Sequence, residues 1–166
     1  MMKSTLIAAS VATLALSLSA CQRGETSTRT TVEKDGATAS VEISDAWCRP
    51  TPNGAQAAAC YLTLEASGDN RVTGVATPFA AGAAIHDMTM VGGVMRMSEM
   101  PAGLPLAAGT PAVLAPGGKH LMLTGLTAPL VEGVSTPLTL TFSATPALTV
   151  QAAVRQPTDR ERRGAH

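Results

Sequence analysis

The sequence predicts an all-β fold, a single-domain sandwich of about seven to nine short strands. Apolar and polar residues alternate with period two in several segments, which is the pattern of strands with one buried face. Glycine and proline, at 15 and 11 of the 166 residues, divide the chain into short pieces. No stretch longer than a few residues shows helical spacing with caps.

Four segments carry the clearest strand signal. Val41 and Ile43 alternate with polar residues on the way to Trp47, and residues 60–64, 138–142 and 148–152 repeat the pattern. Two further turn signals bear on function, because each can start a new strand: Gly92-Gly93 and Pro116-Gly117-Gly118.

The beginning of the chain is typical of a lipoprotein export signal. Lys3 is followed by an uncharged apolar run over residues 6–18, too short to span a bilayer, and then by Leu18-Ser19-Ala20-Cys21. This ending resembles the bacterial lipobox, so we expect residues 1–20 to be a lipoprotein signal peptide and Cys21 to become a lipidated N-terminus. The alternative is an ordinary cleaved signal that ends beside a cysteine.

Two segments offer few side chains for burial. Residues 21–38 are polar and predict a disordered tether, and residues 156–166 lack apolar periodicity and predict a flexible C-terminal tail. The folded domain is therefore expected over residues 39–155.

The charges of the chain balance, with 12 basic and 12 acidic residues. A net charge of zero argues against nucleic acid or an anionic lipid surface as the partner. We therefore expect the lipid anchor to hold the protein to a membrane, on the periplasmic side of the cell envelope.

Histidine and methionine gather in the middle of the chain. Two of the three histidines and six of the eight methionines lie within residues 86–122. They form two clusters: His86-Asp87-Met88-Thr89-Met90 continuing to Met95-Arg96-Met97 and Met100, and His120-Leu121-Met122. Thioether and imidazole are the donors of a soft, monovalent metal site, so the pattern indicates a copper-binding protein. The alternative is a lipid-anchored structural or interaction sandwich whose methionines only pack.

Strand geometry would turn these clusters into a site. A two-residue turn at Gly92-Gly93 pairs Met97 with Met88 and leaves His86 one diagonal step away on the same face. The Pro116-Gly117-Gly118 turn would start another strand. If that strand lies beside the hairpin, four soft donors converge at one rim of the sandwich: His86, Met97, His120 and Met122.

The donor set suits Cu(I). This ion has a filled d shell and favours polarizable sulfur, and a thioether binds it without losing a proton. In an oxidising compartment a thiolate ligand risks forming a disulfide, which makes methionine the safer source of sulfur.

The same residues resemble the periplasmic copper chaperone family PCu(A)C over about residues 40–155. The resemblance rests on Asp45-Ala46-Trp47-x-Arg49, Ala59-x-Tyr61-Leu62, Ile85-His86-Asp87-Met88, Gly93-Val94-Met95-Arg96-Met97 and Pro116-Gly117-Gly118-x-His120-Leu121-Met122-Leu123. The family motif is a histidine, ten residues, a methionine, about twenty-one residues and His-x-Met. Here ten and twenty-two residues occupy the two intervals, and the extra one falls in a Pro- and Gly-rich loop that tolerates insertion.

This resemblance implies a cupredoxin-like Greek-key sandwich that holds Cu(I) with His86, Met97, His120 and Met122. Met88 could be an alternate ligand, while Met90 and Met95 fall outside the motif. The family is associated with supplying copper to the CuA centre of cytochrome c oxidase, often alongside Sco-type proteins. A copper-accepting protein is therefore the expected partner.

Cys48 and Cys60 need a separate interpretation. Eleven residues lie between them in an exported chain, and Pro50 to Gly54 can fold back as a hairpin loop. A disulfide across two neighbouring strands is favoured, whereas the spacing does not fit a C-x-x-C redox or metal site.

Other functional classes find little support. The chain contains no nucleophile elbow, His-Glu-x-x-His run or phosphate loop, so we do not expect an enzyme. A blue-copper electron-transfer site needs a cysteine near its histidine and methionine, and none follows Cys60. Asp87 and Glu99 flank the clusters and are expected to be solvent-facing charges with at most a weak negative field.

Overall fold

The computed structural model of the protein describes residues 27–34 and 37–163. The expected signal peptide, residues 1–20, and the expected lipidation site Cys21 lie outside these residues. Within the described part, no helix has the length and apolar character needed to cross a membrane.

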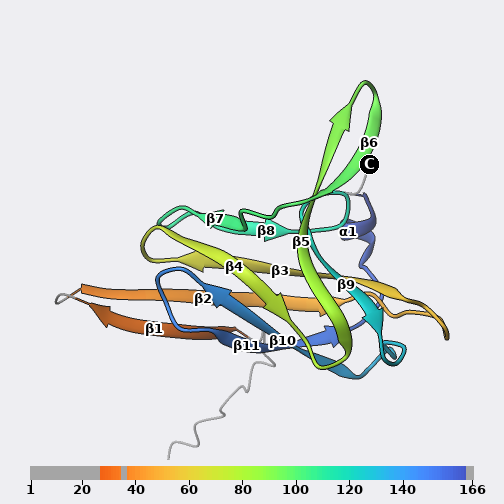
Figure 1. Ribbon diagram of the computed structural model, residues 1–166, viewed down its shortest axis with the longest axis horizontal. Helices are drawn as coiled ribbons and strands as arrows, with labels where there is room; N and C mark the ends of the chain where they lie inside the picture. The colour runs from red at the N-terminus through yellow and green to blue at the C-terminus, as the bar shows by residue number, and fades with distance from the viewer. Residues whose placement is uncertain (1–26, 35–36, 164–166) are drawn as a thin grey trace, which may run out of the picture.

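The all-β prediction is confirmed, because strands form almost all of the regular structure (Figure 1). In chain order the elements are β1 (Thr28–Lys34), β2 (Ala37–Cys48), β3 (Ala57–Ala66), β4 (Asn70–Ala76), β5 (Ala80–Val91), β6 (Val94–Glu99), β7 (Leu104–Leu106), β8 (Ala112–Leu114), β9 (His120–Leu126), β10 (Ser135–Phe142), β11 (Leu148–Val154) and α1 (Asp159–Arg163). The described residues thus contain eleven strands, more than the seven to nine expected. The excess arises from β1 and from the three-residue strands β7 and β8, which are too short to show alternation.

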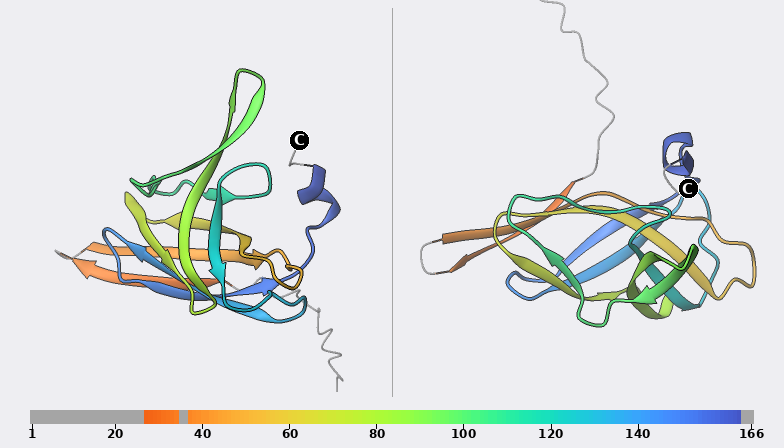
Figure 2. Two further views of the ribbon diagram at one scale, coloured as in Figure 1. Left: turned by 45° about the vertical axis from the view of Figure 1, so that its right-hand side comes forward. Right: turned by 90° about the horizontal axis from the view of Figure 1, so that it is seen from above.

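The strands form one continuous hydrogen-bonded sheet in the order β6-β5-β9-β3-β2-β11-β10-β4-β7. Strand β1 pairs with β2 and strand β8 with β3, off this path. Although β4 and β5 are far apart in the order, they contact each other, so the sheet curls around its own core. Figure 2 shows the resulting curved body from two further directions.

The core lies inside this curl and consists mainly of aliphatic side chains. Alternation along the strands sends every second residue inward, which buries Leu62 and Leu64 of β3 and Leu138 and Leu140 of β10 almost completely. Each fully buried leucine contributes about 1.5–3 kcal/mol relative to exposure. These leucines compensate for the small number of aromatic residues.

The predicted disulfide is present between Cys48 and Cys60. The two residues are direct cross-strand partners of β2 and β3, and both are fully buried. The bridge therefore fastens together two neighbouring strands, as the sequence predicts.

The chain ends of the domain differ from expectation. Part of the expected disordered tether, residues 21–38, forms β1, which pairs with β2 from Thr28↔Ile43 to Lys34↔Ala37. Threonine and valine favour an extended backbone, and the Arg29–Glu42 ion pair joins the two strands, so this part of the tether is a strand instead. Within the expected tail, residues 159–163 form the short helix α1, and the flexibility of residues 156–166 stays a prediction.

Candidate metal centre

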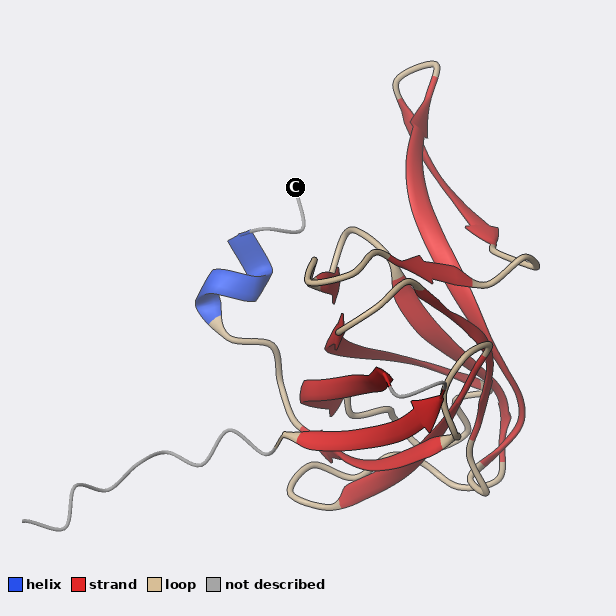
Figure 3. Ribbon diagram, turned by 90° about the vertical axis from the view of Figure 1, so that its left-hand side faces the viewer, coloured by secondary structure: helices blue, strands red, loops and turns tan. Residues whose placement is uncertain are grey.

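The hairpin of β5 and β6 projects beyond the rest of the sheet (Figure 3). Its turn residues Gly92 and Gly93 have φ angles of 60° and 79°, as a two-residue turn of the type favoured in hairpins requires. Val91 pairs with Val94 at the end of the hairpin, and Met88 pairs with Met97. The hairpin register is therefore the one that the sequence predicts.

Strand β9 lies on the other side of β5 and brings in the second cluster. His86 is the direct cross-strand partner of His120, and Ala84 is the partner of Met122. Met122 is consequently one diagonal step from His86, a separation that long side chains can bridge.

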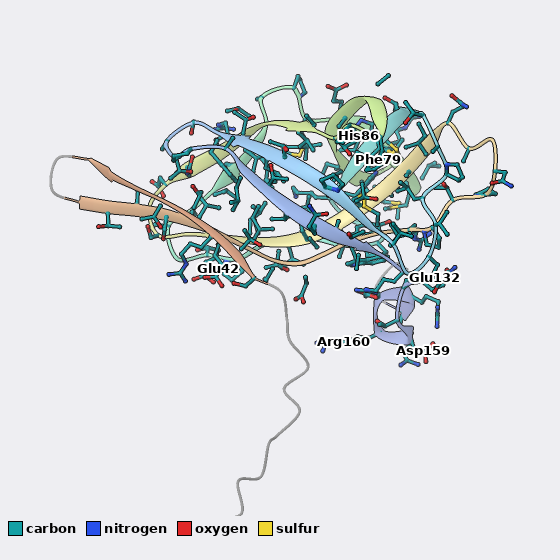
Figure 4. All side chains as sticks on the ribbon, turned by 90° about the horizontal axis from the view of Figure 1, so that it is seen from below. Glu42, Phe79, His86, Glu132, Asp159 and Arg160 are labelled. Carbon is teal, nitrogen blue, oxygen red and sulfur yellow. A yellow bond between two sulfur atoms is a disulfide. The ribbon has the colours of Figure 1, made fainter. Side chains whose placement is uncertain are left out.

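The expected donors share one face of these three strands. Ile85, Leu121 and Leu123 alternate with them and are buried in the core, so the donors lie on the opposite, outer face. The structure thus brings together five residues around β5: His86, Met88, Met97, His120 and Met122. His86 occupies the middle of the group and is labelled on β5 in Figure 4.

The two imidazole rings are close, with centroids 5.8 Å apart. Nδ1 of His120 lies 3.0 Å from the carbonyl oxygen of Gly118. A carbonyl can only accept, so Nδ1 carries the proton and donates it in this hydrogen bond. The lone pair of Nε2 in the neutral ring is then free for a ligand, an arrangement common among metal-binding histidines.

His86 adds an unsatisfied polar atom to the group. Its Nδ1 is buried and has no hydrogen-bond partner among the described residues. A buried polar atom without a partner costs about 1–3 kcal/mol, and a bound cation would remove that cost. The residues present therefore fit a metal ion.

The two sides of the group differ in exposure. His120 is only 7% exposed, whereas Met97 on β6 is 50% exposed. His120 thus lies on the closed side of the group and Met97 on the open side.

Rings from two further strands close the buried side, a feature that the sequence analysis did not identify. Tyr61 lies 6.4 Å from the His120 ring between centroids, and Trp47 lies 4.5 Å from Tyr61. The guanidinium of Arg155 covers Trp47 at 4.1 Å, and burial raises the pKa of the Tyr61 phenol. Trp47 is buried, as expected of a core aromatic, but its ring belongs to this row. The alternation of side chains along β3 could have revealed this feature. Successive residues on a strand point to opposite faces, so Tyr61 must face away from its buried neighbour Cys60.

The expected negative field at the rim is weakened by an ion pair. Asp87 Oδ2 lies 3.4 Å from Lys119 Nζ, and both side chains are partly exposed. Glu99 is exposed and pairs with His86 across β5 and β6. In the described part of the chain, no three His, Cys, Asp or Glu side chains gather to hold a metal, so the donors here are imidazole and thioether.

Comparison with known protein families shows which family the chain belongs to. The family described as "Putative lipoprotein LpqE-like" matches residues 41–154. The chain belongs to this LpqE-like family. A curated protein of similar sequence, "Putative lipoprotein Lxx21020" from Leifsonia xyli subsp. xyli, is 36% identical over 103 residues. The chain spans 62% of the length of this relative, and the match covers 62% of the chain.

Solved structures extend the comparison of this LpqE-like chain. The copper-bound PCuAC domain from PmoF2 superposes with a TM-score of 0.59 at 23% identity, covering 70% of this chain and 93% of that one. CuI-DR1885 from Deinococcus radiodurans superposes with a TM-score of 0.55 at 30% identity, covering 66% and 74%. The fold is thus that of PCuAC domains, which confirms the cupredoxin-like sandwich implied by the resemblance.

Proposed function

We propose that this LpqE-like protein is a copper chaperone of the cell envelope. It binds Cu(I) with His86, Met97, His120 and Met122, with Met88 as a possible alternate ligand. The observation that carries the proposal is the gathering of these side chains from three neighbouring strands on one outer face. The Cu(I)-bound state of DR1885, which shares 30% identity, supports the same cargo.

The chemistry of the donors favours this ion over the common alternatives. Neutral thioethers select Cu(I), whereas Zn²⁺, Mg²⁺ and Ca²⁺ prefer thiolate, imidazole or oxygen ligands. Cys48 and Cys60 are joined to each other and offer no thiolate. Copper is here a cargo that arrives and leaves as the same monovalent ion.

The difference in exposure suggests how the ion leaves. A sulfur of the acceptor can replace Met97 first, because this thioether is half-exposed and carries no charge. His120 remains bound until later, since its ring is buried and its Nδ1 is fixed by Gly118. Each exchange breaks one copper–ligand bond and forms another without change of oxidation state.

The acceptor and the anchor complete the proposal. A CuA centre of cytochrome c oxidase, or a Sco-type protein that serves it, is the proposed recipient. Lipid attached to Cys21 would hold the protein at the periplasmic face of a membrane, in keeping with its membership of a lipoprotein family. The balanced charge of the chain leaves this attachment to the lipid.

A double substitution tests the ligand set. Met97→Leu with Met122→Leu removes two sulfur atoms and nearly conserves volume, so the fold should persist. Cu(I) affinity should fall by more than about 10-fold. Loss of a residue that only supports a metal ligand already costs about that much, and here two ligands themselves are removed. Competition against a chromophoric Cu(I) chelator measures the affinity, and X-ray absorption reports the loss of sulfur donors.

Met100→Leu is the matched control. Met100 packs against the core and is outside the donor group, so the same chemical change there should leave Cu(I) affinity unaltered. If the double variant binds Cu(I) as tightly as this control, the chaperone assignment is wrong and a structural sandwich without metal becomes the better interpretation.

A further inference from the structure

The methionine pattern continues along the hairpin beyond the proposed copper site. After the Met88–Met97 pair, Met90 lies directly opposite Met95. Since residues two apart on a strand share a face, both pairs point to the same side as His86. The outer face of the hairpin therefore presents thioethers at two successive positions.

The other face of the same hairpin has a different character. There Asp87 pairs with Ser98 and Thr89 with Arg96, and the Val91–Val94 pair follows at the turn, so this face carries no thioether. Sulfur is thus restricted to one face of a ribbon whose residues 89–99 are all exposed. Exposure to solvent on both faces gives no reason for methionine to occur on one face only.

Packing does not account for the outer pair. Met90 is 62% exposed and Met95 is 44% exposed, and neither contributes to the hydrophobic core of the described residues. Methionine ordinarily fills gaps in a core, a role that is absent at this tip. A ligand role is consistent with both the exposure and the one-sided arrangement.

We propose that Met88, Met90 and Met95 form a second site, built from thioethers alone, for a soft monovalent cation such as Cu(I). Directly opposite Cβ atoms are about 4.5–5.5 Å apart, and residues two apart on a strand are separated by roughly 6.8 Å. Three flexible side chains with three rotatable bonds each can close around one ion from these positions. Low coordination numbers and sulfur donors suit Cu(I).

Met97 links this tip site to the first one. It lies opposite Met88, one diagonal step from His86, and two residues from Met95 along β6. An ion moving inward breaks its bond to Met95 and forms one to Met97, with no proton or electron transferred. Met90 and Met95 belong to the tip site alone, whereas the role of this site as an entry or exit station rests on the proposed function.

The test is an anaerobic Cu(I) titration of the full chain with methionine methyl groups labelled with ¹³C. The wild-type protein should take up about two equivalents, and the methyl signals of Met90 and Met95 should shift with the weaker one. Met90→Leu with Met95→Leu should reduce the stoichiometry to about one equivalent and leave the tighter affinity unchanged. Circular dichroism verifies that this exposed, near-isosteric double variant is folded.

Separate readouts distinguish this proposal from the chaperone assignment. In the Met97→Leu and Met122→Leu variant, the Met90 and Met95 methyl signals should still shift. Met100→Leu, which removes one sulfur elsewhere, should retain both equivalents. The tip site is refuted if the wild type saturates at one equivalent, or if the Met90 and Met95 signals stay fixed, and either result leaves the His86–His120 site untouched.

Discussion

Tyr61 and Trp47 show how single residues shape the surroundings of the candidate site. They are the only tyrosine and tryptophan in the chain, and they stand in one row with His120 on the outer face of the sheet. Large rings exclude water from the buried side of the imidazole, so the proposed ligand exchange would occur at the exposed side, where Met97 lies. The single tyrosine and the single tryptophan thus lie where they restrict access to the buried side of His120.

The disulfide lies directly beside this row, and its removal should destabilise the fold. Cys48 and Cys60 are fully buried partners on β2 and β3, next to the Trp47–Tyr61 pair. Replacing both with alanine should lower the free energy of unfolding by about 2–4 kcal/mol, the usual effect of a native bridge. Urea unfolding measures this, in a Cys21→Ser background so that no third thiol can exchange. An unchanged midpoint would show that the bridge adds nothing to stability.

At the scale of elements, the turn of the β5–β6 hairpin should control copper binding through register. Gly92 and Gly93 adopt positive φ angles, and a Cβ on either would touch nothing. Any cost of substitution therefore comes from the backbone, about 1–2 kcal/mol for each residue held in the left-handed region. Gly92→Val with Gly93→Val should loosen the Met88–Met97 pairing and weaken Cu(I) binding in the chelator competition.

Gly92→Asn is the matched control for this turn, because asparagine followed by glycine suits the same turn type. It should retain the hairpin and the Cu(I) affinity of the wild type. Equal affinities for the valine and asparagine variants would mean that hairpin register does not govern the site.

Sequence alone predicted those features of the elements that depend on local rules. The glycine turn fixed the opposition of Met88 and Met97, and alternation separated donors from core leucines. The adjacency of β5 and β9, which joins His86 to His120, was only conditional in the sequence, because long-range pairing has no local signature. Strand β1 was missed for a related reason: its polar face gains stability only from pairing with β2.

At the scale of the whole molecule, the sheet separates stability from function. Its inner face carries the leucine core, and the outer face of one end, β6-β5-β9, carries the histidines and methionines. Helix α1 lies outside the sheet, where Asp159 and Arg160 are labelled in Figure 4. Exposed methionines can therefore be exchanged or substituted without disturbing the side chains that hold the domain together.

The attachment of α1 to the sheet should weaken as the pH falls. Glu161 accepts hydrogen bonds from Arg155 at 2.8 and 2.9 Å and from the backbone and hydroxyl of Thr158, in the manner of a capping box. The Arg155 hydrogen bond, with those of Thr158, lowers the pKa of Glu161 from 4.5 to about 2. A carboxylate with a depressed pKa in the folded state stabilises that state fully above pH 4.5 and loses this contribution as the pH falls through about 2. The carboxylate is partly exposed, so the contribution is about 1 kcal/mol or less.

Fluorescence of Trp47 can follow this change, because Arg155 joins Glu161 to the indole and the chain has no other tryptophan. Between pH 4.5 and 2 the emission of the wild type should shift as protonated Glu161 releases Arg155. Glu161→Gln cannot ionise and therefore mimics the protonated acid. Its emission should already be shifted at pH 7, and lowering the pH should not produce the Glu161-dependent shift that the wild type shows. Identical titrations of the two proteins would refute the coupling between α1 and the Trp47 row, since other carboxylates titrate in both.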